Sequence, residues 1–308
     1  MIIIRIMGGL GNQMQQYALY KKLESLGREV RLDTQWFCLQ KIQDNVYAKR
    51  ELELNYFDGI SFQEATQKEI ESILGRMYED GEDIFDKIRK LIRPATYPSF
   101  TEKDMYHEQV LQFENKYLVG YWACEKYYAD ILPQLRATMI FPRSYKEELN
   151  QRNDEMIQKM ESCDSVSIHI RRGDYLDPAN RAMFGGICTD TYYETAIRYM
   201  KEKCPNARFF LFSDDAEYVR GKFKGNEYEV IDWNHDRDSF YDMMLMSHCK
   251  HNICANSTFS FWGARLNPYE DKITIRPSIH KNTQVCVPEE MRDLWKGWAL
   301  IAPQGAII

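Results

Sequence analysis

Between residues 165 and 276, short apolar runs alternate with stretches of helical spacing. The apolar runs predict strands at residues 165–170, 208–212, 228–232, 251–255 and 272–276. The intervening residues 190–200, 216–223, 239–247 and 261–266 have the spacing of helices. Strands that alternate with helices form a parallel sheet with helices on its faces. The second half is therefore predicted to be a Rossmann-like nucleotide-binding layer.

The first residues predict a βαβ unit. Residues 2–6 form a β-branched strand, residues 13–26 a helix ended by Gly27, and residues 29–33 a second strand. A further strand is predicted at residues 117–122, and a polar helix at residues 142–162 marks a domain boundary. We expect a domain at residues 1–155 with a helical insertion at about 61–110, and a second domain at residues 156–308. The last residues are candidates to pack back on the first domain.

Composition and charge narrow the class of protein. The chain has 308 residues, is 44% apolar and 28% charged, and carries a net charge of −6. These values are typical of a globular protein and disfavour a nucleic-acid binder, because no general basic field would gather phosphates. Eight scattered cysteines without a CxxC pattern indicate reduced thiols in a cytoplasmic protein. No signal peptide or membrane-spanning run is predicted, and peripheral association with the inner face of a membrane stays open.

The segment His169-Ile-Arg-Arg-Gly-Asp-Tyr175 stands where the predicted strand at residues 165–170 ends. Ligands of open α/β sheets sit outside the carboxyl ends of strands, and arginine can grip phosphate with two parallel hydrogen bonds. The segment therefore predicts an anion site with a carboxylate beside it. A surface ion pair between Arg172 and Asp174 is the equal alternative on this segment alone.

A glycine-rich turn, Gly8-Gly-Leu-Gly-Asn12, precedes the first predicted helix. It is not a dinucleotide fingerprint, since Met14 stands where the third glycine belongs, and this disfavours an NAD-dependent oxidoreductase. The backbone N–H groups at Gly9 and Gly11, together with Asn12, suit an anion or a sugar hydroxyl at the helix start. The alternative is a tight turn that requires positive φ.

A second helix start, Asn256-Ser-Thr258, follows the strand at residues 251–255. Hydroxyls and N–H groups there suit a phosphate, and plain N-capping by Ser257 is the alternative. Two groups look like metal ligands. The spacing of His248, His251 and Cys254 fits no zinc site, and Asp236-Arg-Asp238 matches a short acid-x-acid metal motif that occurs often by chance. No metal site is predicted.

Several motifs in one order resemble the α-1,2-fucosyltransferases of glycosyltransferase family 11. The motifs are Gly8-Gly-Leu-Gly-Asn-Gln13, Gly120-Tyr-Trp-Ala-Cys-Glu-Lys-Tyr127, His169-Ile-Arg-Arg-Gly-Asp-Tyr175, Ser213-Asp-Asp215 and Asn256-Ser-Thr-Phe-Ser-Phe-Trp-Gly263. The resemblance runs from residue 1 to about residue 266. The opening GGLGNQ combined with HxRRxDY is its most specific part.

The resemblance implies an α/β fold of the GT-B type, with two Rossmann-like domains facing a cleft and the donor bound by the second. It implies inverting transfer of L-fucose from GDP-β-L-fucose to the 2-hydroxyl of a terminal β-galactose, with no metal and no cofactor. Lactose, N-acetyllactosamine and Gal-β-1,3-GalNAc are the types of acceptor expected. A non-catalytic GDP-sugar-binding protein and a fucosyltransferase of another linkage are the alternatives.

The resemblance also implies a role for individual residues. Arg171 should hold the β-phosphate with His169 close to the nucleotide, and Ser257 and Thr258 should contact the diphosphate. Asp242 should accept hydrogen bonds from guanine, and Asn12, beside Gly9 and Gly11, should lie near the pyrophosphate or the acceptor.

The general base is the role that transfers least securely. An inverting transfer usually needs a group within hydrogen-bond reach of the acceptor hydroxyl. Asp174 and Asp177 follow the arginines and are the candidates. Asp174 could instead orient Arg172 or Asn12.

Overall fold

The chain divides into two units, Met1–Ile140 and Phe141–Ile308. The computed structural model describes residues 1–39, 44, 49–74, 99–103 and 105–308, without the side chains of Asp174 and Ala179. The boundary expected at residues 155/156 falls inside helix α6 (Glu147–Glu161), which belongs to the second unit.

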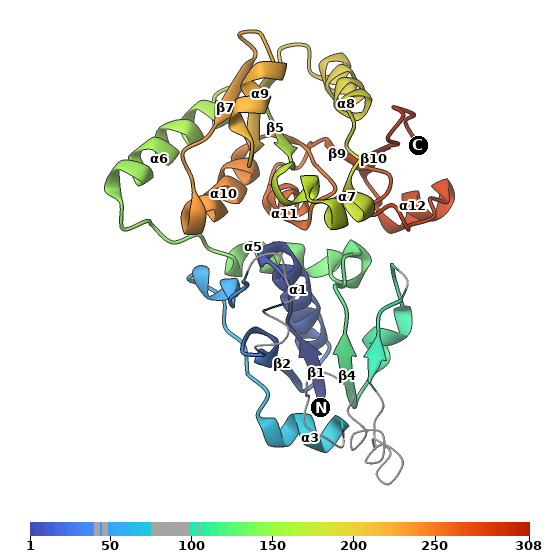
Figure 1. The fold of residues 1–308 in the computed structure, drawn as a ribbon. Helices are drawn as coiled ribbons and strands as arrows, with labels where there is room; N and C mark the ends of the chain where they lie inside the picture. The colour runs from blue at the N-terminus through green and yellow to red at the C-terminus, as the bar shows by residue number, and fades with distance from the viewer. Residues whose placement is uncertain (40–43, 45–48, 75–98, 104) are drawn as a thin grey trace. The chain divides into compact units, whose positions relative to one another are not determined.

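A parallel sheet forms the first unit. Its described strands are β1 (Ile2–Arg5), β2 (Val30–Asp33), β3 (Phe100–Thr101) and β4 (Lys116–Val119), in the order β2-β1-β4-β3 (Figure 1). Helix α1 (Leu10–Ser25) joins β1 to β2, so the predicted βαβ unit is confirmed. Gly27, at φ +75°, ends α1, and its N–H bonds back to the carbonyl of Glu24 at 2.8 Å.

Helix α3 (Gln67–Leu74) covers one face of this sheet, where Ile70 and Ile73 pack with Ile3 and Tyr117. It lies in the predicted insertion, whose residues 75–98 and 104 are outside the described part. Two 3-10 turns, η4 (Glu125–Tyr127) and η5 (Ala129–Ile131), precede α5 (Leu132–Thr138).

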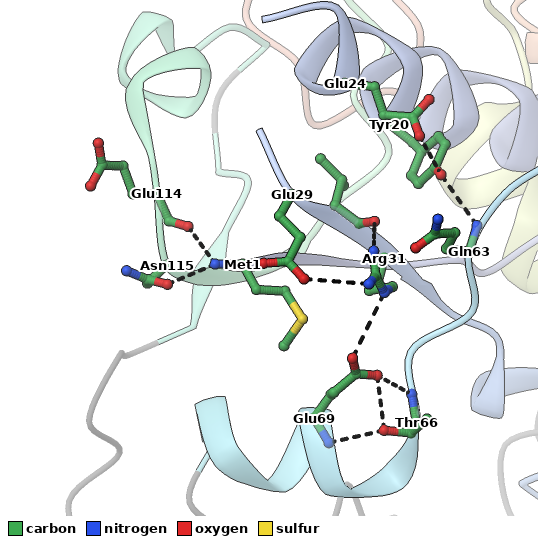
Figure 2. Close-up of polar contacts among 11 residues, drawn as sticks. Met1, Tyr20, Glu24, Glu29, Arg31, Gln63, Thr66, Glu69, Glu114 and Asn115 are labelled. Carbon is green, nitrogen blue, oxygen red and sulfur yellow. Dashed lines mark hydrogen bonds and ion pairs between the residues drawn. The ribbon is translucent and has the colours of Figure 1, made fainter. Parts of the chain in front are cut away.

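Polar contacts fix the edge of this sheet where its strands begin (Figure 2). The amino group of Met1 donates to the Asn115 side chain at 2.7 Å and to the Glu114 carbonyl at 3.0 Å. On the neighbouring strand, Arg31 lies 3.7 Å from Glu69, which in turn caps α3 through Thr66. The start of β1 is therefore tied to the start of β4, and β2 is tied to α3.

The second unit contains a six-stranded parallel sheet in the order β10-β9-β8-β5-β6-β7. Its strands are β5 (Ser165–Ile170), β6 (Arg208–Ser213), β7 (Tyr228–Ile231), β8 (His251–Ile253), β9 (Thr274–Pro277) and β10 (Trp298–Ile301). The five predicted strands are confirmed, and β10 is a sixth that the pattern did not reveal. Strand order reverses between β5 and β8, where nucleotide-binding sheets of the Rossmann type place their ligand.

Helices cover both faces of this sheet. They are α6, α7 (Pro178–Phe184), α8 (Asp190–Lys203), α9 (Ala216–Lys222), α10 (Phe240–His248), α11 (Thr258–Leu266) and α12 (Pro288–Leu294). Alternate residues of β6 divide the core, since Phe209 and Leu211 pack with α8 and α9, whereas Phe210 and Phe212 pack with α6 and α10. The predicted α/β class, with a parallel sheet in each unit, is confirmed.

The last residues fold along the second unit. Ile301 bridges Ile307, and the Thr189 hydroxyl, at the start of α8, donates to the carbonyl of Pro303. Among the described residues, no helix is long and apolar enough to cross a bilayer.

Candidate active site

Two arginine–aspartate pairs stand at the carboxyl ends of β5 and β6. The strands pair in register up to Ile170 and Ser213. The next residues therefore lie opposite each other, Arg171 by Asp214 and Arg172 by Asp215. Arg171 Nη1 lies 2.8 Å from Asp214 Oδ2, and Arg172 Nε lies 2.9 Å from Asp215 Oδ2. The arginines are thus held from the neighbouring strand.

Asp214 and Asp215 have further bonds that fix both arginines. Asp214 accepts the backbone N–H of Arg172 at 2.9 Å, and Asp215 caps α9 by accepting the N–H of Tyr218 at 3.0 Å. That N–H and then Arg172 lower the pKa of the Asp215 carboxyl. A Cβ at Gly173 would lie 2.4 Å from Asp214 Oδ2, so glycine there leaves Asp214 room to reach Arg171.

A cavity of about 300 Å³ opens beside Arg171 on the side of α7, α8 and α9. Its cationic lining consists of Arg171, Arg172, Arg181 and Lys222, and its aromatic lining includes Tyr175, Phe184 and Tyr218. The Tyr175 hydroxyl donates to the carbonyl of Asn256 at 3.0 Å, which ties the loop after β5 to the loop after β8. The cavity can therefore hold a polar ligand group next to a fixed cation.

His169 is buried and neutral. Burial and then the charge of Arg171 lower its pKa to about 3. Its ring lies 5.8 Å from that of Phe259 on α11, and its Nδ1 has no hydrogen-bond partner among the described residues. Positive charge at this edge therefore comes from the arginines, and His169 offers an uncharged ring.

The start of α11 lies at the end of β8, which neighbours β5. Asn256 has a structural role, since its Nδ2 donates to the carbonyls of Phe184 and His280 at 3.0 and 3.1 Å. Ser257 occupies the N-cap position, but its side chain makes no capping hydrogen bond. Ser257 and Thr258 are both partly exposed. The capping alternative thus holds for the position of Ser257 and not for its hydroxyl.

Asp242, in the first turn of α10, is a partly protonated carboxyl near neutral pH. Burial raises its pKa to about 7, the Asn234 side chain opposes the rise, and Asp232 adds to it. Asn234 Nδ2 donates to Asp242 at 2.8 Å and is itself bound to Asn153. A ligand that donates hydrogen bonds to this carboxyl would stabilise its charged form and lower its pKa.

The groups that look like metal ligands have other partners. His248 pairs with Glu161 at 2.9 Å, the His251 Nε2 lies 3.2 Å from Cys204 Sγ, and Asp238 pairs with Lys146 at 2.6 Å. Across the described part of the chain, no group of three or more histidine, cysteine, aspartate or glutamate residues could hold a metal.

In the first unit, the glycine turn after β1 is a tight turn as well as a helix start. Gly8 has φ +81°, and a Cβ there would lie 2.7 Å from Asn12 Nδ2. The start of α1 already receives a carboxylate of the chain, because Glu53 accepts the N–H of Leu10. The positive-φ alternative is confirmed for Gly8.

The turn is also held from α1 and from a distant segment. Gln13 Nε2 donates to the carbonyls of Gly8 and Glu51, both at 2.9 Å. An ideal Cβ on Gly9 would lie 3.4 Å from Arg50 Nη1, whereas Gly11 is buried within α1. The predicted residues Gly9, Gly11 and Asn12 lie in the first unit, which spans Met1–Ile140.

The two candidates for the general base are placed to different extents. Asp177 precedes α7, and its carbonyl accepts the N–H of Arg181 at 2.7 Å. The side chain of Asp174 lies outside the described part, within the 3-10 turn η6 (Gly173–Leu176).

Comparison with known proteins decides the family. The sequence profile described as Glycosyl transferase family 11 matches residues 92–302. The O-antigen biosynthesis glycosyltransferase WbnK of Escherichia coli is 35% identical over 88% of this chain and 91% of its own length. The chain belongs to glycosyltransferase family 11. It is therefore a glycosyltransferase of the α-1,2-fucosyl or colitosyl type.

Other relatives of this glycosyltransferase are similar over different spans. An alpha-1,2-colitosyltransferase of Escherichia coli is 31% identical over 90% of this chain and 91% of its own length. The galactoside alpha-(1,2)-fucosyltransferase 1 of Leontopithecus chrysomelas is 27% identical over 33% of this chain and 28% of its own length. The crystal structure of NodZ alpha-1,6-fucosyltransferase soaked with GDP-fucose has a TM-score of 0.43 at 15% identity, covering 87% of this chain and 92% of that one.

Sequence reasoning quoted Ser213-Asp-Asp215 as a motif and gave its acids no role. The structure assigns Asp214 to Arg171 and Asp215 to Arg172. The signal was present, because two consecutive predicted strands end in Arg-Arg and Asp-Asp. Asn234, which binds Asp242, carried no comparable signal, since its partner lies on the next helix.

Proposed function

We propose that this glycosyltransferase transfers L-fucose from GDP-β-L-fucose, with inversion, to the 2-hydroxyl of a terminal β-galactose, without a metal. One observation carries the proposal. In a family 11 chain, Arg171 is held by Asp214 at the point where the strand order of a Rossmann-type sheet reverses.

The chemistry requires a cation at this place. As the bond to the anomeric carbon breaks, negative charge grows on the β-phosphate of the departing GDP. A guanidinium already oriented by Asp214 stabilises that charge without reorganising, and it can form two hydrogen bonds with the phosphate. Ser257 and Thr258 add hydroxyl and N–H donors at the start of α11.

Asp242 supplies selectivity for guanine. Guanine presents the N1–H and the amino group on one edge, and an ionised carboxylate accepts from both. Adenine lacks this pair of donors, so the same carboxylate would disfavour it. Because the pKa of Asp242 is about 7, guanine binding should drive its carboxyl toward the charged form.

The acceptor hydroxyl must lose a proton as it attacks. Asp174 and Asp177 stay the candidates for the general base, and Asn12 stays the candidate for a contact to the pyrophosphate or the acceptor. Replacing each aspartate by asparagine, with GDP binding measured in parallel, assigns the role to the variant that loses transfer while keeping affinity for GDP. We also propose a cytoplasmic location, with peripheral membrane association as its variant.

The test uses GDP-fucose with lactose, N-acetyllactosamine and Gal-β-1,3-GalNAc, followed by NMR of any product to fix linkage and anomer. An α-1,2-fucosylated galactoside is expected. GDP-colitose forms a second donor arm, because a relative that is 31% identical is named a colitosyltransferase. Transfer from GDP-colitose alone, or a linkage other than α-1,2, would overturn the donor or the linkage. GDP binding with no transfer would leave a binding protein.

A further inference from the structure

The loop after β4 in the first unit holds an exposed tyrosine next to a strained, buried tryptophan. Tyr121 is 48% exposed, whereas Trp122 is fully buried and has φ +54°. Positive φ in a bulky residue costs about 1–3 kcal/mol and persists only where the surroundings impose it. A backbone held in this way fixes the direction in which the Cα–Cβ bond of Tyr121 points.

Three side chains impose this conformation. Glu102 Oε2 accepts the N–H groups of Tyr121 and Trp122, each at 2.8 Å. From α1, Gln15 Nε2 donates to the carbonyl of Tyr121 at 3.3 Å, and Gln16 Nε2 donates to that of Gly120 at 3.0 Å. The N–H and the carbonyl of Tyr121 are therefore both engaged before any ligand arrives.

Gln16 also joins this loop to the loop after β1. Gln16 Oε1 accepts the N–H of Met7 at 2.9 Å while its Nε2 holds Gly120. Strands β1 and β4 are parallel neighbours, so both loops lie at the carboxyl edge of the sheet (Figure 1). Ligands of α/β sheets bind at this edge.

Almost half of Tyr121 is exposed. Its environment raises the pKa of the hydroxyl through desolvation, and the positive charge of the buried Arg5 opposes the rise. A tyrosine side chain is a rigid aromatic surface with few rotamers to lose on binding.

The chemistry of this edge suits an uncharged sugar. The groups that hydrogen-bond to this loop are two amides and a carboxylate already occupied by two N–H groups, and, among the described residues, the one cation that acts on the Tyr121 hydroxyl, Arg5, is buried. A single exposed aromatic needs no explanation by itself. Here, however, a strained backbone and three side chains fix it at a ligand-binding edge. A pyranose offers a matching C–H face with hydroxyls at its rim.

We propose that Tyr121 is the platform on which the terminal galactose ring of the acceptor stacks. This inference rests on the proposed function for the identity of the sugar. It assigns Tyr121 to acceptor recognition and leaves the chemistry of leaving-group stabilisation to Arg171.

Saturation-transfer NMR with lactose, without donor, tests the stacking directly on the full chain. The wild type and Tyr121→Phe should transfer saturation to the galactose C–H protons, whereas Tyr121→Ala and Tyr121→Leu should bind lactose about ten-fold more weakly. Tyr145→Ala is the matched control, because Tyr145 is fully exposed in the second unit. Tyr121→Leu keeps apolar bulk, so its loss of binding would show that the aromatic face matters.

Kinetics separate this role from a structural one. For Tyr121→Leu, we expect the acceptor KM to rise about ten-fold, with kcat and the affinity for GDP within two-fold of wild type. Unchanged lactose binding by Tyr121→Leu, or no galactoside binding by the wild type, overturns the inference. Lactose binding that depends on Tyr121 in a protein without transferase activity would overturn the proposed function and leave the inference standing.

Discussion

The carboxyl edges of the two sheets have the same architecture and opposite chemistry. In the second unit, Arg171 and Arg172 pair with Asp214 and Asp215, so the edge presents fixed charge. In the first unit, amides of α1 hold the loops, and an exposed tyrosine, Tyr121, follows β4. A parallel sheet sets where a ligand binds, and the loop residues set which ligand it is.

The two edges are also held in different ways. The register between β5 and β6 places the two arginines after β5 opposite the two aspartates after β6. By contrast, Gln16 hydrogen-bonds to both Met7 and Gly120, and Gly120 follows Gln16 by 104 residues in sequence. The charged edge is therefore sensitive to single charges, and the neutral edge to the loss of buried amides.

Arg171→Lys should cause the largest loss of activity at the charged edge of the second unit. A point charge replaces a two-pronged group, so transfer should fall about 100-fold and GDP affinity should weaken. Arg220→Lys is the control, since Arg220 forms a surface pair with Asp232. Steady-state transfer rates and GDP calorimetry measure both effects. Equal values for Arg171→Lys and wild type would remove Arg171 from the donor site.

Gln16→Leu should lower the stability of the first unit. It leaves the Met7 N–H and the Gly120 carbonyl without their partner, at a cost of about 2–4 kcal/mol in the free energy of unfolding. Gln151→Leu, on the exposed surface of α6, is the matched control. Denaturant unfolding of both variants measures the difference, and equal stabilities would show that the amide does not hold the loops.

Asp214→Asn should loosen the hold on Arg171 without removing the arginine. The amide can still accept the Arg172 N–H but loses the charge opposite Arg171, so transfer should fall about ten-fold. Combined with Arg171→Lys, it should cause little further loss, because Asp214 acts through Arg171. Additive losses in the double variant would mean that Asp214 acts on the substrate independently.

The pH dependence of GDP-fucose binding tests Asp242. Its raised pKa of about 7 means that the carboxylate becomes the main form only above neutral pH. Affinity should therefore increase several-fold from pH 6 to pH 8, and Asp242→Asn should flatten this profile and relax guanine selectivity. GDP-fucose is the probe because its phosphates do not titrate in this range. A profile that Asp242→Asn leaves unchanged would exclude the contact.

The same raised pKa has the opposite effect on stability. The folded protein holds the Asp242 proton more tightly than the unfolded chain does. The stabilisation that results is present at low pH and is lost as pH rises through about 7. Unfolding of the wild type and Asp242→Asn at pH 5 and pH 8 measures this loss, which the asparagine variant should lack.

Much of the second unit could be predicted from the sequence, because short apolar runs and helical spacing report directly on strands and helices. Strand β10 was missed, since Trp298-Ala-Leu-Ile301 is short and lies after the last regular alternation. The position of Arg171 at a strand end was predictable, whereas the bond from Asn234 to Asp242 depends on tertiary packing. The role of Gln16 was hidden for the same reason, because helical spacing does not reveal which loops an inward amide will meet.

Transfer in the presence of EDTA tests the central claim, that arginine supplies the positive charge at the leaving group. Wild-type protein is assayed with GDP-fucose and the preferred galactoside, in EDTA and then with Mg²⁺ or Mn²⁺ added back. The same rate is expected in all three conditions. A rate abolished by EDTA and restored by Mn²⁺ would contradict it and return Asp236 and Asp238 to consideration.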